Sequence, residues 1–208
     1  MIIALEGIIG VGKSHFIKTI RKNFSNVKIF TEGIDKKKYK RLVKDYYTDP
    51  HTHAYPFQLT MLWRKAKDGL KAQRYDDATE GNGIALIERT ISSNNRVFCK
   101  MAYDKGYFDK DYFELYNDAY EDLKFMLKQP DMILYLHCPV EFAFQNIADR
   151  KRDGEELIQI EYLEKLQFLY GEWIENYKGK VEDIYFNNFL TEEDICEIFQ
   201  RVIEGGRK

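Results

Sequence analysis

Short runs of apolar residues recur along the chain, and longer segments with a mixed pattern separate them. Each run has the length of a strand, and the runs lie at 2–5, 27–31, 84–87, 132–136 and 184–186. A run without any charged residue, such as 132–136, is typical of a strand that is buried on both faces of a sheet. The pattern therefore predicts five strands.

The segments between these runs repeat their apolar residues at helical spacing. The predicted helices lie at about 15–20, 35–47, 54–75, 111–127, from Pro139 onward, 160–177 and after Thr191. Thr191 and Asp194 have the spacing of a capping box. The aromatic stretch between Thr90 and Asp111 is expected to be irregular. Strands that alternate with helices predict an α/β fold, in which helices flank a five-stranded parallel sheet.

Parallel sheets of this type bind ligands at the carboxyl ends of their strands. The polar residues that follow the predicted strands are therefore candidates for a site. They include the glycine-rich segment after the first strand, Glu32 after the second, and Glu88 and Arg89 after the third.

The segment between the first strand and the first helix has the spacing of a phosphate-binding P-loop, Gly-x-x-x-x-Gly-Lys-Ser. Its residues are Gly7, Ile8, Ile9, Gly10, Val11, Gly12, Lys13 and Ser14. We expect their backbone N–H groups to surround the phosphates of a nucleotide. Lys13 would contact the outer phosphates, and the Ser14 hydroxyl would bind Mg²⁺. A glycine-rich turn without a ligand is the less favoured alternative.

Composition limits the partners and the compartment. The chain has 208 residues, which suits a single domain over 1–208. A net charge of −2 argues against nucleic acid as a partner, and no apolar run reaches the ~20 residues that span a membrane. The early P-loop leaves no room for a signal peptide. The cysteines, Cys99, Cys138 and Cys196, are odd in number and far apart, which favours a cytoplasmic protein without disulfides.

Several motifs occur in the order and spacing of the deoxyribonucleoside kinases. They are the P-loop, Tyr47-Thr48-Asp49-Pro50, Pro56-Phe57-Gln58, Glu88-Arg89-Thr90, Arg150-Lys151-Arg152 and the segment 161–166. The chain thus resembles the family of the deoxycytidine, deoxyguanosine and mitochondrial thymidine kinases and the insect multisubstrate enzyme. The resemblance implies a homodimer with the P-loop NTPase fold and a short lid at about 150–156. It also implies Mg²⁺-dependent phosphoryl transfer from ATP to the 5′-hydroxyl of a deoxynucleoside.

The resemblance assigns the catalytic roles to the strand ends. Glu32 would accept the proton of the 5′-hydroxyl, and it would repel a substrate that already carries a phosphate. Arg89 would contact the 5′-oxygen and the incoming phosphoryl group, where negative charge gathers. Together with Lys13 these residues form the predicted catalytic set, while Glu88 would reach Mg²⁺. A structural ion pair is the alternative for Glu88 or Arg89.

A second group of residues would hold the base. Phe57, Gln58, Met61 and Lys65 share one face of the predicted helix 54–75, which makes an unusual core stripe and a reasonable base-binding wall. By resemblance, Phe98 opposes Phe57, and Asn94 lies near the base edge. Core packing is an alternative of about equal weight for Phe57 and Phe98. Because Lys65 and Asn94 stand where relatives carry arginine and aspartate, or methionine and alanine, we lean toward broad specificity, or deoxycytidine and purine deoxynucleosides.

The remaining predicted contacts belong to the sugar and to ATP. Tyr47 and Glu155 resemble the pair that binds the 3′-hydroxyl, and Tyr47 has an ordinary aromatic role as its alternative. Arg150 and Arg152 of the lid would close on the ATP phosphates, with Phe189 beside the adenine. Asn146 stands where relatives usually carry a further arginine.

Two other functions remain open. A nucleoside monophosphate kinase such as thymidylate kinase would use the same scaffold, but Glu32 argues against a phosphorylated acceptor. A regulatory ATPase would leave the face of Phe57 and Gln58 unexplained. The four histidines, His15, His51, His53 and His137, have no ligand spacing and are expected to play no part in a metal site.

Overall fold

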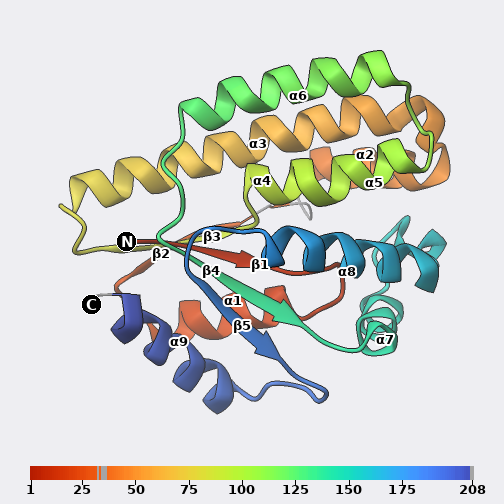
Figure 1. Cartoon of the computed structure of the whole chain (residues 1–208). Helices are drawn as coiled ribbons and strands as arrows, with labels where there is room; N and C mark the ends of the chain where they lie inside the picture. Colours follow the sequence, from red (N-terminus) through yellow and green to blue (C-terminus); the bar gives the residue numbers. More distant parts are fainter. Residues whose placement is uncertain (32, 34–36, 207–208) are drawn as a thin grey trace.

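A computed structural model describes residues 1–31, 33 and 37–206, and its centre is a five-stranded parallel sheet (Figure 1). The strands are β1 Ile2–Glu6, β2 Val27–Phe30, β3 Ile84–Glu88, β4 Met132–His137 and β5 Val181–Tyr185. Their order across the sheet is β2-β3-β1-β4-β5, and all neighbours are parallel. The predicted α/β fold class is confirmed.

Strand β1 occupies the middle of the sheet, and all five of its residues are buried. On one side Leu5 is in register with Glu88 of β3, and on the other side Glu6 is in register with Tyr135 of β4. Because the strands run in the same direction, the residues that follow β1, β2, β3 and β4 meet at one edge. This edge carries the P-loop.

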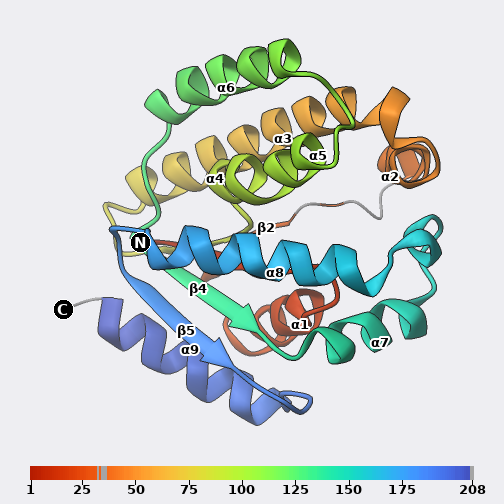
Figure 2. The same ribbon diagram turned by 45° about the vertical axis from the view of Figure 1, so that its right-hand side comes forward.

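Helices cover both faces of the sheet. They are α1 Lys13–Asn23, α2 Lys37–Thr48, α3 Pro50–Ala78, α4 Ile91–Ser93, α5 Lys100–Asp104, α6 Lys110–Phe125, α7 Val140–Arg150, α8 Ile160–Glu175 and α9 Glu192–Gly206. A π-helix, η1 Asn94–Cys99, joins α4 to α5, and a short 3₁₀ helix, η2 Glu155–Leu157, precedes α8. Helices α1 and α9 lie together on one side, while α3 and α6 lie on the other with α8 along the sheet (Figures 1 and 2).

Two apolar clusters hold these layers together. The main core joins the central strands to both helical layers, with Phe16 of α1, Phe199 of α9 and Tyr170 of α8 fully buried in it. A second cluster packs α3 against α6 through Leu62 and Tyr116, among others. The long helix α3 therefore has one face toward the sheet and another toward α6.

Apart from small shifts at other helix and strand ends, the structure differs from the sequence-based expectation in three places. Helix α3 begins at Pro50 rather than at 54, because the Asp49 side chain accepts the Thr52 N–H and proline is tolerated in the first turn. Strand β5 begins earlier than predicted, at Val181 instead of 184. The stretch after Thr90, expected to be irregular, is helical, since Thr90 and Ser93 form a reciprocal capping box that starts it.

Other expectations can be compared directly. Thr191 and Asp194 do form a capping box, with bonds of 2.7 to 3.1 Å. Cys99 and Cys138 are buried, whereas Cys196 is only partly covered, and all three thiols are free. Within the described ranges, no helix combines the length and the apolar character needed to cross a membrane.

Candidate active site

The P-loop conformation depends on its three glycines. Gly7, Gly10 and Gly12 have φ angles of 139°, 84° and 102°, which other residues rarely adopt. A Cβ at Gly7 would lie 2.4 Å from the Leu136 carbonyl oxygen, and one at Gly10 would lie 2.2 Å from the Ala143 carbonyl oxygen. Gly7 therefore lies against the backbone of β4 and Gly10 against the backbone of α7, and neither position has room for a Cβ.

Helix α1 begins directly after this loop, so its N-terminal N–H groups face the loop's concave side. The Lys13 ammonium donates to the carbonyl oxygens of Gly7 and Ile8, at 2.9 and 2.7 Å. Ser14 is exposed, whereas the side chains of Ile8 and Val11 are buried in the core. Ile8 and Val11 can thus offer only backbone groups to a nucleotide.

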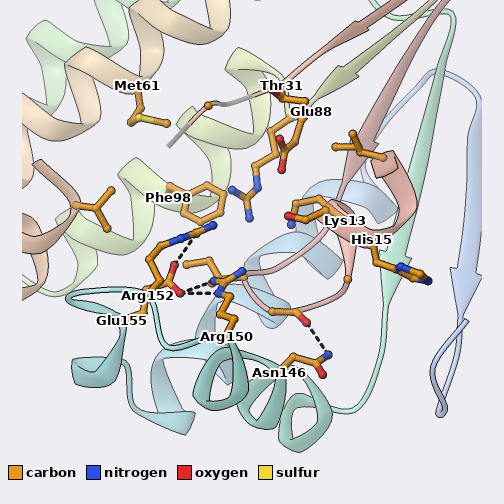
Figure 3. Close-up of a pocket in the computed structure, with 18 of the residues that line it drawn as sticks. Lys13, His15, Thr31, Met61, Glu88, Phe98, Asn146, Arg150, Arg152 and Glu155 are labelled. Carbon is orange, nitrogen blue, oxygen red and sulfur yellow. Dashed lines mark hydrogen bonds and ion pairs between the residues drawn. The ribbon is translucent and has the colours of Figure 1, made fainter. Parts of the chain in front are cut away.

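One cavity of about 620 Å³ runs from the P-loop to helix α3. The predicted site residues that line it are Ile9, Gly10, Gly12, Lys13, Ser14, Tyr47, Phe57, Gln58, Met61, Glu88, Arg89, Asn94, Phe98, Arg150, Arg152, Glu155 and Phe189. Met61 and Phe98 lie on the α3 side, Lys13 on the P-loop side, and the lid arginines close the cavity from α7 (Figure 3). Gly7, Ile8, Val11 and Lys65 do not line it.

Arg89 lies in the turn after β3 in an unusual backbone conformation, with φ of 61°. Its N–H donates to the Leu5 carbonyl at 3.0 Å, and its guanidinium donates to the Gly7 carbonyl through Nη2 at 3.2 Å. The Phe98 ring lies 4.6 Å from the guanidinium carbon. Arg89 is thus held between the P-loop and the π-helix. It lies between the part of the cavity beside the P-loop and the part beside α3.

Glu32, the predicted proton acceptor, lies outside the described residues. The described residues on either side of it, Thr31 and Gly33, both line the cavity. They do so at the end of β2, on the same edge as Arg89.

The α3 wall presents an aromatic ring, an amide and a thioether from Phe57, Gln58 and Met61. Gln58 is only 1% exposed, and among the described residues its Oε1 has no hydrogen-bond partner. A buried polar atom without a partner is uncommon in folded proteins. Its presence in a cavity wall indicates a place where a ligand supplies the missing donor.

Asn94 and Lys65 have contacts that the sequence did not reveal. The Asn94 amide nitrogen donates to the Gln58 backbone carbonyl at 3.3 Å and to the Tyr116 hydroxyl at 2.7 Å, so both of its N–H groups are used within the protein. The Lys65 ammonium donates to the Glu88 carbonyl at 2.6 Å. Lys65 therefore ties α3 to the turn that carries Arg89.

Tyrosines from α2 and α8 form the wall beside the lid. Tyr46 stacks on Phe57 with ring centroids 4.7 Å apart, and its hydroxyl lies 3.3 Å from that of Tyr162. Burial above all, then the neighbouring Tyr46 and the charge of Glu155, raises the pKa of Tyr47 well above its usual range, so its hydroxyl stays protonated. Tyr46 and Tyr162 line the cavity but were not predicted, because isolated tyrosines carry no spacing that separates a site from a core.

The lid closes on itself through one carboxylate. Glu155, only 4% exposed, accepts from Arg150 Nε at 2.6 Å and from Arg152 Nη1 at 2.9 Å (Figure 3). At Gly154 a Cβ would lie 2.8 Å from the Cα of Lys44, so the lid touches the backbone of α2. The predicted sugar ligand and the predicted phosphate ligands are thus in contact with each other.

Asn146 of α7 and His15 of α1 lie close to the P-loop and line the cavity there. Asn146 donates to the Gly10 carbonyl at 2.9 Å, a bond to the loop itself. His15 Nε2 lies 3.1 Å from the Leu190 carbonyl oxygen, and its ring meets that of Phe189 edge to face. His15 lines the cavity, although histidine spacing alone gave no reason to place it there.

Ser14 and Glu88 supply oxygen ligands of the kind that Mg²⁺ prefers. In the part of the chain that the structure describes, no group of three or more histidine, cysteine, aspartate or glutamate residues could hold a metal on its own. This fits Mg²⁺ that arrives with a nucleotide, because the ion keeps waters and phosphate oxygens as most of its ligands.

Comparison with known proteins gives a consistent family. The deoxynucleoside kinase family model matches residues 3–204. The deoxyadenosine kinase of Dictyostelium discoideum is 26% identical over 207 residues, which cover 99% of this chain and 80% of that protein. The deoxyadenosine/deoxycytidine kinase of Bacillus subtilis is 26% identical over 216 residues, covering 100% and 95%.

A solved structure is similar over the whole length. The deoxyadenosine kinase of M. mycoides, described with the products dCMP and a flexible dCDP bound, has a TM-score of 0.78 and 25% identity. The match covers 99% of this chain and 100% of that one.

Proposed function

The chain belongs to the deoxynucleoside kinase family of ATP-dependent phosphotransferases, and we propose that it phosphorylates the 5′-hydroxyl of deoxynucleosides whose base carries an exocyclic amino group. The observation that carries the proposal is the unpartnered Gln58 oxygen in the cavity wall. Such an acceptor pairs with the amino group of adenine or cytosine.

The base preference is supported by a second acceptor. Because the Asn94 amide nitrogen is bonded to Gln58 and Tyr116, Asn94 offers its oxygen to the cavity. Two oxygens near one base edge favour a base that donates hydrogen bonds. Deoxyadenosine, deoxycytidine and deoxyguanosine meet this requirement, while thymidine offers only its ring N–H. The names of the Bacillus subtilis deoxyadenosine/deoxycytidine kinase and the M. mycoides deoxyadenosine kinase agree with this choice.

The proposed reaction begins with the deoxynucleoside between Phe57 and Phe98, its 3′-hydroxyl at Tyr47 and Glu155. Glu32 accepts the proton of the 5′-hydroxyl as the oxygen attacks the γ-phosphorus of ATP, and ADP leaves. Arg89, already directed at the P-loop, stabilises the charge that builds up between the two substrates.

The donor half holds the triphosphate. Lys13 exchanges its bonds with the P-loop carbonyls for the outer phosphates, and Arg150 and Arg152 approach from the lid. Phe189, which lines the cavity with its ring largely exposed, would cover the adenine. Ser14 and Glu88 would hold Mg²⁺, which neutralises phosphate charge and orients the γ-phosphoryl group.

A phosphorylation panel tests the proposal. The four deoxynucleosides and their 5′-monophosphates are each supplied with ATP and Mg²⁺, and ADP and product are measured. We expect a higher kcat/KM with deoxyadenosine, deoxycytidine and deoxyguanosine than with thymidine. Preference for thymidine would refute the base assignment, turnover of monophosphates alone would favour a nucleoside monophosphate kinase, and ADP release without an acceptor would favour an ATPase.

Assembly as a homodimer in the cytoplasm is also part of this proposal. Helices α3 and α6 expose Leu59, Trp63 and Leu115, of which Trp63 and Leu115 are 59% and 57% exposed. These side chains suit a subunit interface. Light scattering should give twice the 24.8 kDa chain mass, and Trp63→Glu should give the monomer mass. The three free thiols suit a reducing compartment.

A further inference from the structure

Glu6 is a buried carboxylate for which the proposed mechanism has no use. It is the last residue of β1 and immediately precedes the P-loop, yet its side chain is fully buried, with 0% exposure. Glutamate is almost never buried so completely unless it is paired or hydrogen-bonded. Its contacts therefore indicate what it does.

All of the hydrogen bonds described for the Glu6 side chain lead toward the turn after β3 or to α8. Oε1 accepts the N–H and the hydroxyl of Thr90, at 2.8 and 2.9 Å. Oε2 accepts the Tyr170 hydroxyl at 3.1 Å. One carboxylate thus joins the end of β1, the residue after Arg89 and helix α8.

The turn that Glu6 holds has an energetically unfavourable backbone. Arg89, with φ of 61°, adopts a left-handed conformation that persists only where its surroundings impose it. On its carboxyl side Thr90 is bonded twice to Glu6, and on its amino side the Glu88 carbonyl accepts from Lys65. Arg89 is fixed between these two contacts, and this fixes the direction in which its guanidinium leaves the backbone.

The charges reinforce the geometry. Burial raises the pKa of Glu6, while the nearby Arg89 guanidinium and the Thr90 donors oppose that rise. Arg89 is itself 8% exposed. The attraction between a buried cation and a buried carboxylate offsets part of the desolvation cost of both, so each supports the placement of the other.

We propose that Glu6 is a positioning residue for phosphoryl transfer, which acts through Arg89 by holding the 88–90 turn against the P-loop. This inference rests on the role proposed above for Arg89. Glu6 lies behind the turn and touches neither substrate. Its loss would leave both binding halves in place but would let the guanidinium drift from the reacting oxygens.

The test compares Glu6→Gln with a control at a second carboxylate, which contacts the other end of β1. Glutamine keeps the shape and an acceptor for Thr90, but it removes the charge beside Arg89. We expect kcat to fall about tenfold to a hundredfold, the scale of a small misplacement of a catalytic group, with KM for both substrates changed less than about threefold. Asp131→Asn is the control, because Asp131 accepts the Ile2 N–H at 2.6 Å at the opposite end of β1, and we expect its kcat to be unchanged.

A double-mutant cycle separates positioning from general stability. If Glu6 acts through Arg89, Glu6→Gln should change kcat less than about threefold once Arg89 is methionine, since coupled residues are not additive. Effects that multiply, or full kcat in folded Glu6→Gln, would overturn the inference. Full activity of Arg89→Met alone would instead refute the proposed role of Arg89, so the two failures can be told apart.

Should Glu6→Gln not fold, Tyr170→Phe decides the question. It removes one donor to Glu6, together with the contact of the Tyr170 hydroxyl to the Gly7 backbone, and leaves both Thr90 bonds. We expect kcat to fall about threefold or more, with unchanged KM values and a melting temperature close to that of the parent protein. An unchanged kcat in this variant would overturn the inference.

Discussion

The proposed donor half of the cavity, for ATP, and the proposed acceptor half, for the deoxynucleoside, are built in different ways. The phosphate-binding part of the donor half is one continuous segment, Gly7–Ser14, in which backbone groups and three glycine conformations create the site. The acceptor half is assembled from side chains of α2, α3, the π-helix η1 and the lid, which are far apart in the chain. The donor half therefore depends on conformation, whereas the acceptor half depends on packing.

This difference predicts how each half fails. A glycine that has no room for a Cβ cannot be replaced without displacing the loop. A single substitution of such a glycine in the donor half should therefore cause a large loss of activity with ATP. Side chains in the acceptor half each contribute one contact, so their substitutions should act by degrees and on one substrate at a time. The predictions below test this contrast.

The largest effect is expected at Glu32, which belongs to catalysis rather than to either binding half. Glu32→Gln should lower kcat about 10³-fold, because the 5′-hydroxyl loses its proton acceptor, while the deoxynucleoside Kd stays nearly the same. Steady-state kinetics and calorimetric titration measure the two quantities. Glu161→Gln, at an exposed position of α8, is the control, and an unchanged kcat in Glu32→Gln would remove this residue from the mechanism.

The next largest effect is expected from Gly10→Ala in the donor half. The new Cβ would lie 2.2 Å from the Ala143 oxygen at a φ of 84°, so the loop must move, and kcat/KM for ATP should fall about 10²-fold or more. Gly205→Ala in α9 meets nothing within 4 Å and should leave kinetics unchanged. A merely twofold change for Gly10→Ala would contradict the contrast between the halves.

In the acceptor half, Gln58→Leu should raise KM for the deoxynucleoside about tenfold, the equivalent of one hydrogen bond. The KM for ATP should not change, because Gln58 lies on α3, away from the P-loop. An equal rise in both KM values would show that the two halves are not independent. Lys67→Gln, at an exposed position of α3 outside the cavity, is the control for kinetics.

The smallest effect is expected from Glu155→Gln, at the boundary between the halves. Its removal frees both lid arginines and weakens the predicted contact to the 3′-hydroxyl, so KM values for ATP and for the deoxynucleoside should both change, each by no more than about fivefold. A change confined to one substrate would place Glu155 wholly in one half.

The strands and the phosphate-binding loop could be predicted because a short continuous stretch of sequence determines each of them. Apolar runs give the strands, and Gly-x-x-x-x-Gly-Lys-Ser gives the loop. The order β2-β3-β1-β4-β5 and the capping of α3 by Asp49 required the structure. A proline near a helix start reads as a break as easily as a beginning.

The acceptor half was predictable only where a helix face or a family motif brought residues together. Gln58 and Met61 are examples, since helix geometry places them on one face. Lys65 shares that face in projection, but its long side chain reaches the Glu88 carbonyl, which spacing cannot reveal. The π-helix at Asn94–Cys99 and the burial of Glu6 depend on tertiary packing and left no local pattern.

The close approach of Gly154 to Lys44 bears on how the two substrates meet. Helix α2 carries Tyr47, which lines the cavity, and touches the lid at the backbone, with no space for a methyl group between them. A deoxynucleoside bound at Tyr47 would therefore stabilise α2 together with the lid. The lid carries the arginines that are proposed to bind ATP. We expect the first substrate to favour the second, so that entry of the nucleoside prepares the enzyme for its phosphate donor.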